Sequence, residues 1–167
     1  MVEAVVFYVF GAIAVIGSAL MITRRNPVSS AWSLVIVMVC LAALFVALSA
    51  TFVAAMQIIV YAGAVMVLFL FVVMLLNLSE EELGKPKVTG IKILGIIVSV
   101  GFLVELIAMS LRAPAETGGL VEGFGQIIPI ARLLFTTYLL PFEITSVILL
   151  AAIVGAVVLA QRKREKK

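Results

Sequence analysis

Long runs of apolar residues, separated by short polar segments, occupy most of the chain. Between Asn26 and Ser79 there is no charged residue at all, and the other runs are each long enough for one crossing. An α-helix of about 20 apolar residues spans the hydrocarbon core of a bilayer. A membrane β-barrel would instead alternate apolar and polar positions, and these runs are continuous. The pattern therefore predicts an all-α polytopic membrane bundle.

The runs predict five transmembrane helices in a single membrane domain, residues 1–167. Glu3 and the lack of a positive leading segment favour a retained first helix over a cleaved secretory signal. The run after Asn26 is too long for one crossing, and we divide it near Ser49–Thr51. Asn26 can cap the second helix, and Pro27 suits its first turn, where no N–H is needed. The five expected spans are about 4–23, 27–48, 52–76, 91–111 and 141–161.

The basic residues lie almost entirely on one side of this arrangement. Of the twelve Lys and Arg residues, ten fall on the side of the C-terminal tail, residues 162–167, and only Arg112 and Arg132 fall on the other. Cytoplasmic loops of membrane proteins are enriched in Lys and Arg. We therefore expect the C-terminus in the cytoplasm, the N-terminus outside and residues 112–140 as an outside loop. Its second part, QIIPIARLLFTTYLL from Gln126 to Leu140, is expected to run along the membrane interface.

Composition narrows the function. The chain is 65% hydrophobic and 13% charged, and it has no histidine, no aspartate and a single cysteine, Cys40. Metal sites need clusters of such ligands. We therefore expect no metal site and no bound redox cofactor in this chain. The net charge of +3 comes from helix ends and the tail, which indicates membrane topology rather than a nucleic-acid surface.

Two glutamates fall inside the expected spans. Glu105 lies about 9 Å inward from the end of the fourth helix, at 1.5 Å per residue. A charge there costs about 2.5–3.5 kcal/mol, so we expect this carboxyl to be protonated, paired with Arg112 or Arg132, or facing a hydrated interior. A role in proton handling is the alternative to pairing. Glu143 follows Pro141 in the first turn of the fifth helix, where the helix N-terminus stabilises an interfacial carboxylate.

The third span carries residues that suit a lipid-facing helix poorly. Gln57 and Tyr61 are four residues apart and so share one face. Gly63 follows near the middle, where it weakens the helix by about 1 kcal/mol relative to alanine. One interpretation is a close packing contact with a buried hydrogen bond. The other is a slip of the hydrogen-bond ladder by one residue, a π-bulge, which often occurs at functional positions.

Three segments resemble a known family. QIIVYAGAVMVLFLFVVMLLN, Gln57 to Asn77, resembles the third-helix signature of subunit J of proton-pumping NADH-quinone oxidoreductase, respiratory complex I. The mitochondrial counterpart is the mitochondrially encoded subunit 6. RNPVSSAWSL, Arg25 to Leu34, is similar to the start of the family's second helix. LLFTTYLLPFEITSVILLAAIVGAVVLA, Leu133 to Ala160, is similar to its last helix, including Glu143. The resemblance covers nearly the whole chain.

The resemblance implies a core membrane-arm subunit of a proton-translocating oxidoreductase, with no catalytic residue of its own. FMN, iron–sulfur clusters and quinone would be bound by other subunits. The partners would be complex I membrane subunits of the A, H, K and N types, together with the lipid bilayer. The chain alone would bind no small-molecule substrate and no nucleic acid. As a multi-pass protein it would lie in a bacterial-type inner (cytoplasmic) membrane.

The resemblance also implies a role for the third helix. In the family this helix is reported to switch between α-helical and π-bulged forms and so to gate the proton path. Carried onto this sequence, the hinge and gate would comprise Gln57, Tyr61, Gly63 and Val67. Some relatives have a glutamate where this chain has Gln57. An amide is not an ionisable relay, so a proton relay is not expected at this position, and ordering of water is the role left open.

Two alternatives keep the five-helix architecture. An equivalent subunit of a related complex would serve ferredoxin or another electron donor, which would bind elsewhere. A small subunit of a cation/proton antiporter would take no part in electron transfer. The second alternative is disfavoured because carriers of that kind tend to break their helices at the midplane, whereas the prolines here flank the spans.

Overall fold

The fold is given by a computed structural model that describes residues 2–76, 90–112 and 123–160. The expected basic tail, 162–167, and the first part of the expected outside loop lie outside the described residues. All regular structure within the described ranges is helical. In chain order the helices are α1 (Val2–Thr23), α2 (Pro27–Ala47), α3 (Thr51–Met56), η1 (Gln57–Val65), α4 (Met66–Leu76), α5 (Gly90–Arg112), α6 (Ile127–Phe135) and α7 (Leu139–Ala160).

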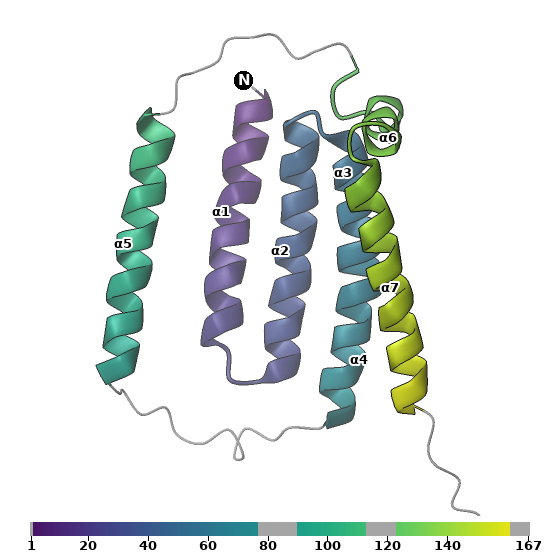
Figure 1. The fold of residues 1–167 in the computed structure, drawn as a ribbon. Coiled ribbons are helices and arrows are strands. Elements are labelled where there is room, and N and C mark those ends of the chain that lie inside the picture. Colours follow the sequence, from purple (N-terminus) through teal and green to yellow (C-terminus); the bar gives the residue numbers. More distant parts are fainter. Residues whose placement is uncertain (1, 77–89, 113–122, 161–167) are drawn as a thin grey trace, which may run out of the picture.

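Five helical segments are long and apolar enough to cross a membrane, which confirms the five spans expected from the sequence. They are Glu3–Thr23, Pro27–Ala47, Thr51–Leu76, Leu94–Arg112 and Leu139–Ala160. The third of them is one continuous rod made of α3, η1 and α4. Figure 1 shows the spans as a row of roughly parallel rods, with the short helix α6 lying across one end of the row.

The packed core consists of α1, α2 and the third span. α1 and α2 form a tight hairpin whose turn is fixed by Asn26, since its Oδ1 accepts hydrogen bonds from the N–H groups of Val28 at 2.9 Å and Ser29 at 3.2 Å. A Cβ added at Gly17 would lie 2.9 Å from Cγ2 of Val37, so a glycine lets these helices approach closely. Most of the buried apolar residues are small: Ala14, Ala31, Val37, Cys40, Ala42, Ala54 and Val73. Small residues at helix contacts are typical of bundles that pack in lipid.

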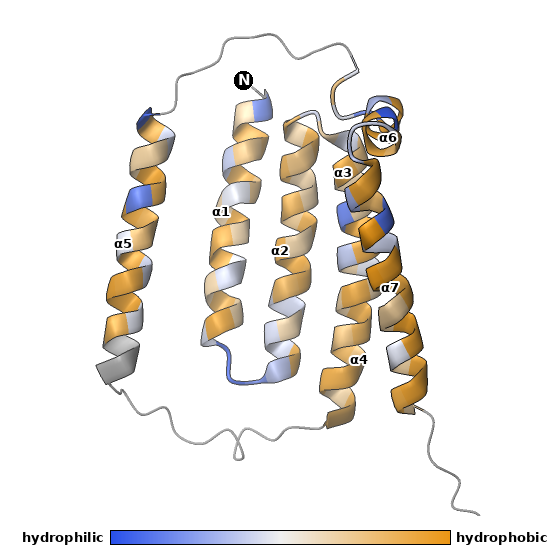
Figure 2. Ribbon diagram, in the orientation of Figure 1, coloured by the Kyte–Doolittle hydropathy of each residue, from blue (hydrophilic) through white to orange (hydrophobic). Residues whose placement is uncertain are grey.

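The outer helices α5 and α7 take little part in this core. No side chain described in either helix is buried, and α7 makes only a small contact, with the neighbouring α6. Figure 2 shows mostly hydrophobic residues on both helices, interrupted by a few hydrophilic positions. Apolar surface of this extent needs lipid or other membrane helices around it.

The start of the fifth span differs from the sequence prediction. α7 begins at Leu139, two residues before Pro141, so Glu143 lies in the second helical turn and not in the first. A proline is tolerated at this point because the first four N–H groups of a helix have no acceptor within it. The carboxylate is therefore two residues further from the helix N-terminus than expected.

Candidate functional site in the third span

The middle of the third span is a π-helix. It comprises the nine residues from Gln57 to Val65, between the α-helical turns of α3 and the α-helix α4. At its end the N–H of Met66 bonds to the carbonyl of Tyr61, five residues back, instead of the usual four. Most π-helices in proteins are single-turn bulges within an α-helix and are frequent at functional sites. Gln57, Tyr61 and Gly63 lie inside the π-helix, and Val67 is the second residue of α4.

The local sequence suits the π ladder. A Cβ added at Gly63 would lie 3.2 Å from the carbonyl oxygen of Ile58, which is five residues earlier. This distance is shorter than an ordinary van der Waals contact, so a side chain at position 63 would require the carbonyl of Ile58 to shift by a few tenths of an ångström in the π form. The β-branched residues Ile58, Ile59 and Val60 lower the preference for a regular α-helix because their χ1 angles are restricted.

Gln57 is the one buried polar side chain among the described residues. Its Nε2 donates a hydrogen bond of 3.1 Å to Sδ of Met38 on α2. A thioether sulfur is a weak acceptor, yet it gives the buried amide a partner where lipid and apolar side chains offer none. The contact ties the first residue of the π-helix to the neighbouring span.

Tyr61 has different surroundings from Gln57, although the four-residue spacing predicted that they would share a face. Its side chain is 52% exposed, whereas Gln57 is buried against α2. The phenol therefore faces away from this chain's own core.

Val67 lines a cavity of about 210 Å³ between the start of α2 and α4. The other lining residues are Val28, Trp32, Leu70, Phe71 and Met74. All of these side chains are apolar or aromatic, so the cavity offers surface to an apolar group. Because Val67 is only two residues beyond the π-helix, the shape of the cavity depends on the hydrogen-bond ladder of η1.

The two intramembrane carboxylates lie on the outer helices. Glu105 is on α5 and Glu143 is on α7, and both side chains are exposed in this chain. Arg132, considered above as a partner of Glu105, is on α6, with which α5 makes no extensive contact. Neither carboxylate is brought to the π-helix by the packing of the described helices.

A contact that the sequence did not reveal lies at the start of the third span. The carbonyl oxygen of Gly125, in the segment before α6, accepts a hydrogen bond of 3.0 Å from the N–H of Phe52 and one of 3.3 Å from Oγ1 of Thr51. Met38 is the other contact residue that sequence reasoning missed. The only signal for Gly125 was the Gly-Phe-Gly turn at 123–125, which says nothing about a partner.

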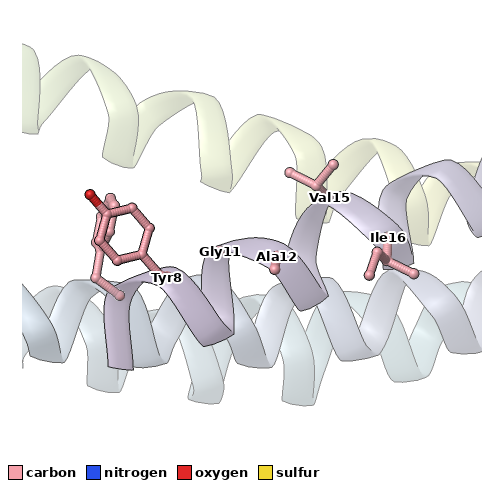
Figure 3. A pocket seen from close by; sticks show the side chains of 6 residues that line it. Tyr8, Gly11, Ala12, Val15 and Ile16 are labelled. Carbon is pink, nitrogen blue, oxygen red and sulfur yellow. The ribbon is translucent and has the colours of Figure 1, made fainter. Parts of the chain in front are cut away.

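An open groove lies on α1, away from these polar contacts. Figure 3 shows its lining, with Gly11 and Ala12 between the larger side chains of Tyr8, Val15 and Ile16. The groove has a volume of about 380 Å³, and a Cβ added at Gly11 would meet nothing within 4 Å. It is an apolar notch of the kind into which a lipid chain or another membrane helix fits.

No group of three or more His, Cys, Asp or Glu residues that could hold a metal occurs in the described part of the chain. The fold and the site therefore define a polytopic membrane protein with five spans, the third of which contains a π-helix. The chain belongs to the family of NADH-ubiquinone/plastoquinone oxidoreductase chain 6, whose sequence profile matches residues 17–159.

Curated relatives agree with this assignment. The chain is 41% identical to NAD(P)H-quinone oxidoreductase chain 6 of Nostoc sp. over 165 residues, which cover 96% of this chain and 82% of the relative. It is 38% identical to NADH-quinone oxidoreductase subunit J of Pseudomonas aeruginosa, with 90% and 92% covered. It is 34% identical to NADH-ubiquinone oxidoreductase chain 6 of Marchantia polymorpha, with 97% and 88% covered.

Proposed function

We propose that this chain is a membrane subunit of a proton-translocating NADH-quinone oxidoreductase and couples quinone reduction to proton translocation through its third span. The observation that carries the proposal is the π-helix Gln57–Val65 within an otherwise α-helical span. Membership of the chain 6 family supplies the complex, and the π-helix supplies an element that can exist in two forms.

The π-helical and α-helical forms of the third span differ in the spacing of their backbone hydrogen bonds. In the π form each N–H bonds five residues back, and in the α form four residues back, so the number of residues per turn changes. A change of ladder between Gln57 and Val65 therefore rotates the residues that follow relative to those that precede. Gln57, Tyr61 and Gly63 lie in the segment that changes and Val67 just beyond it, which makes these four the hinge and gate.

The chain's own contribution is conformational. NADH, FMN, the iron–sulfur clusters and quinone are held by other subunits, and this chain packs against membrane subunits of the A, H, K and N types. The exposed apolar faces of α5 and α7 support such packing, since they need neighbours in the membrane. The Lys and Arg distribution supports a cytoplasmic C-terminus and an outside N-terminus, and the Pseudomonas relative supports a bacterial-type inner membrane.

Replacement of Gly63 tests the proposal. In Gly63→Val the new Cβ lies 3.2 Å from the carbonyl of Ile58, so the π form is disfavoured. We expect coupled quinone reduction and proton pumping to fall, with oxidation of NADH by artificial acceptors in the peripheral arm unchanged. Gly95→Val is the matched control, because a Cβ there meets nothing within 4 Å. Wild-type pumping in Gly63→Val would overturn the proposal.

Purification separates the proposal from its alternatives. Co-isolation of the tagged chain with iron–sulfur subunits supports an oxidoreductase, and a redox-free complex supports an antiporter subunit, which the family match does not favour. A related complex with another electron donor would lack an NADH-binding flavin subunit. The presence of that subunit in the purified complex decides between the two donors.

A further inference from the structure

The third span begins without a cap of its own. The first N–H in this region with an acceptor in the helix is that of Ala54, which bonds to the carbonyl of Ala50 at 3.0 Å. The residue at the N-cap position, Ala50, makes no side-chain cap hydrogen bond. The N–H groups at the start of a helix need an acceptor from elsewhere, and this need is greatest where water is scarce.

A carbonyl that is distant along the chain fills this role. The carbonyl oxygen of Gly125 accepts hydrogen bonds from the N–H of Phe52 and from the hydroxyl of Thr51. Thr51 and Gly125 are 74 residues apart in the sequence. Two donors from the first turn of α3 thus converge on one acceptor. A serine or aspartate side chain at the N-cap position accepts from a helix N–H in the same manner.

The position of Gly125 admits no side chain. Its φ is +72°, and a Cβ added there would lie 2.1 Å from the carbonyl oxygen of Ser49 and 2.7 Å from Cα of Ala50. Ser49 itself has a φ of 61° and turns the chain sharply between α2 and α3. Its N–H bonds to Val46 and that of Ala50 to Phe45, which is a Schellman closure of α2. The backbone of Gly125 rests directly on this turn.

The cap is close to the π-helix. Only α3, from Thr51 to Met56, separates it from Gln57, which is about 9 Å at the rise of an α-helix. At the other end of α3, Gln57 is held by Met38 of α2. The short α-helical segment is therefore fixed at both ends, so a change of ladder in η1 acts on the residues after it.

We propose that Gly125 is a positioning residue: its carbonyl caps the third span and thereby sets the fixed end against which the π-helix changes its ladder. This inference rests on the proposed function. Gly125 also stands two residues before α6, so the cap joins the α6–α7 unit to the segment that holds the hinge.

Hydrogen exchange in the purified complex tests the cap directly. In Gly125→Ala the Cβ clash displaces the carbonyl, and we expect the amide of Phe52, which donates to it, to exchange about fivefold faster, the factor that loss of a helix cap produces. Gly123→Ala is the matched control: its φ is +81°, but the added Cβ meets Pro129 only at 3.4 Å. Unchanged exchange in Gly125→Ala overturns the cap. An equal increase in Gly123→Ala also overturns it, because strain at a positive φ would then explain both results.

Kinetics test the positioning role. For Gly125→Ala we expect a lower kcat of coupled quinone reduction, an unchanged KM for quinone and unchanged NADH oxidation by artificial acceptors. Adding Ala50→Ser supplies a local cap, and the double variant should regain both slow exchange and turnover. Regained protection without regained turnover overturns the positioning role. If Gly125→Ala does not assemble, the wild-type complex still tests the cap: the amide of Phe52, which donates to Gly125, should be protected from exchange, and an unprotected amide there overturns the cap.

The outcomes also separate this inference from the proposed function. Fast exchange in Gly125→Ala together with wild-type pumping in Gly63→Val retains the cap and rejects the coupling role of the third span. Slow exchange in Gly125→Ala together with impaired pumping in Gly63→Val rejects the cap and retains the coupling role.

Discussion

Met38 and Gln57 meet across the interface between α2 and the third span, where Nε2 of the amide donates to Sδ of the thioether at 3.1 Å. The pair joins an ordinary α-helix to the first residue of a π-helix. A methionine is well suited to this place, since its flexible chain fills a core gap and its sulfur still accepts a hydrogen bond.

The pair predicts the effect of removing the sulfur. Met38→Leu keeps the volume nearly constant but leaves the buried amide of Gln57 without an acceptor, which costs about 1–3 kcal/mol. We expect a lower midpoint of thermal inactivation for the purified complex. Met74→Leu is the control, because Met74 is 58% exposed and lies in α4, beyond the π-helix. Equal midpoints for the two variants would show that the sulfur contact contributes nothing.

The spans themselves were predictable because one physical quantity fixes them. The thickness of the bilayer sets the length of an apolar helix, and charged residues end it. The remaining errors are small and have local causes. The third span begins at Thr51 instead of 52, and the fifth at Leu139 instead of 141, since Pro141 can lie inside a first turn whose N–H groups are free.

The site was predictable only in part. Gln57, Tyr61 and Gly63 could be singled out from the sequence because an amide, a phenol and a glycine are each unfavourable in a lipid-facing helix. Their partners could not. Met38 is 19 residues from Gln57, and Gly125 is 74 from Thr51. Such contacts depend on how the helices pack. The sequence pattern of one helix does not identify which residues of another helix will contact it.

Removing the Asn26 cap of α2 should lower the stability of the complex without changing the coupling of quinone reduction to proton pumping. Asn26→Ala removes the Oδ1 that accepts from Val28 and Ser29, which costs about 1 kcal/mol. Asn26→Ser should retain most of the stability, because serine is a comparable N-cap residue. The measurement is the thermal midpoint of the purified complex, with proton pumping per NADH as a second readout. A loss of pumping stoichiometry in Asn26→Ala would contradict a purely local role.

For the phenol of Tyr61 we expect a loss of coupled turnover without a loss of stability. The side chain is half exposed, so Tyr61→Phe should change stability by less than about 0.5 kcal/mol. If the hydroxyl orders water at the gate, coupled turnover should fall about fivefold, which corresponds to one hydrogen bond of about 1 kcal/mol. Tyr8→Phe is the matched control on α1, where Tyr8 is 73% exposed. Equal turnover in the two variants would remove Tyr61 from the gate.

The last prediction concerns Gly63→Ala, which should shift residues 57–65 from the π-helical towards the α-helical form. Alanine suits both helical forms, so its general helix preference does not decide between them. The contact with the carbonyl of Ile58 at 3.2 Å occurs in the π form, and relieving it costs on the order of 1 kcal/mol, about fivefold in population. A cryo-electron microscopy map of the variant complex should therefore show more α-helical density between Gln57 and Val65 than the wild type. Gly155→Ala is the control, because a Cβ at that position meets nothing within 4 Å. A π-helix that is unchanged between Gln57 and Val65 in Gly63→Ala would mean that Gly63 does not set the balance between the two ladders.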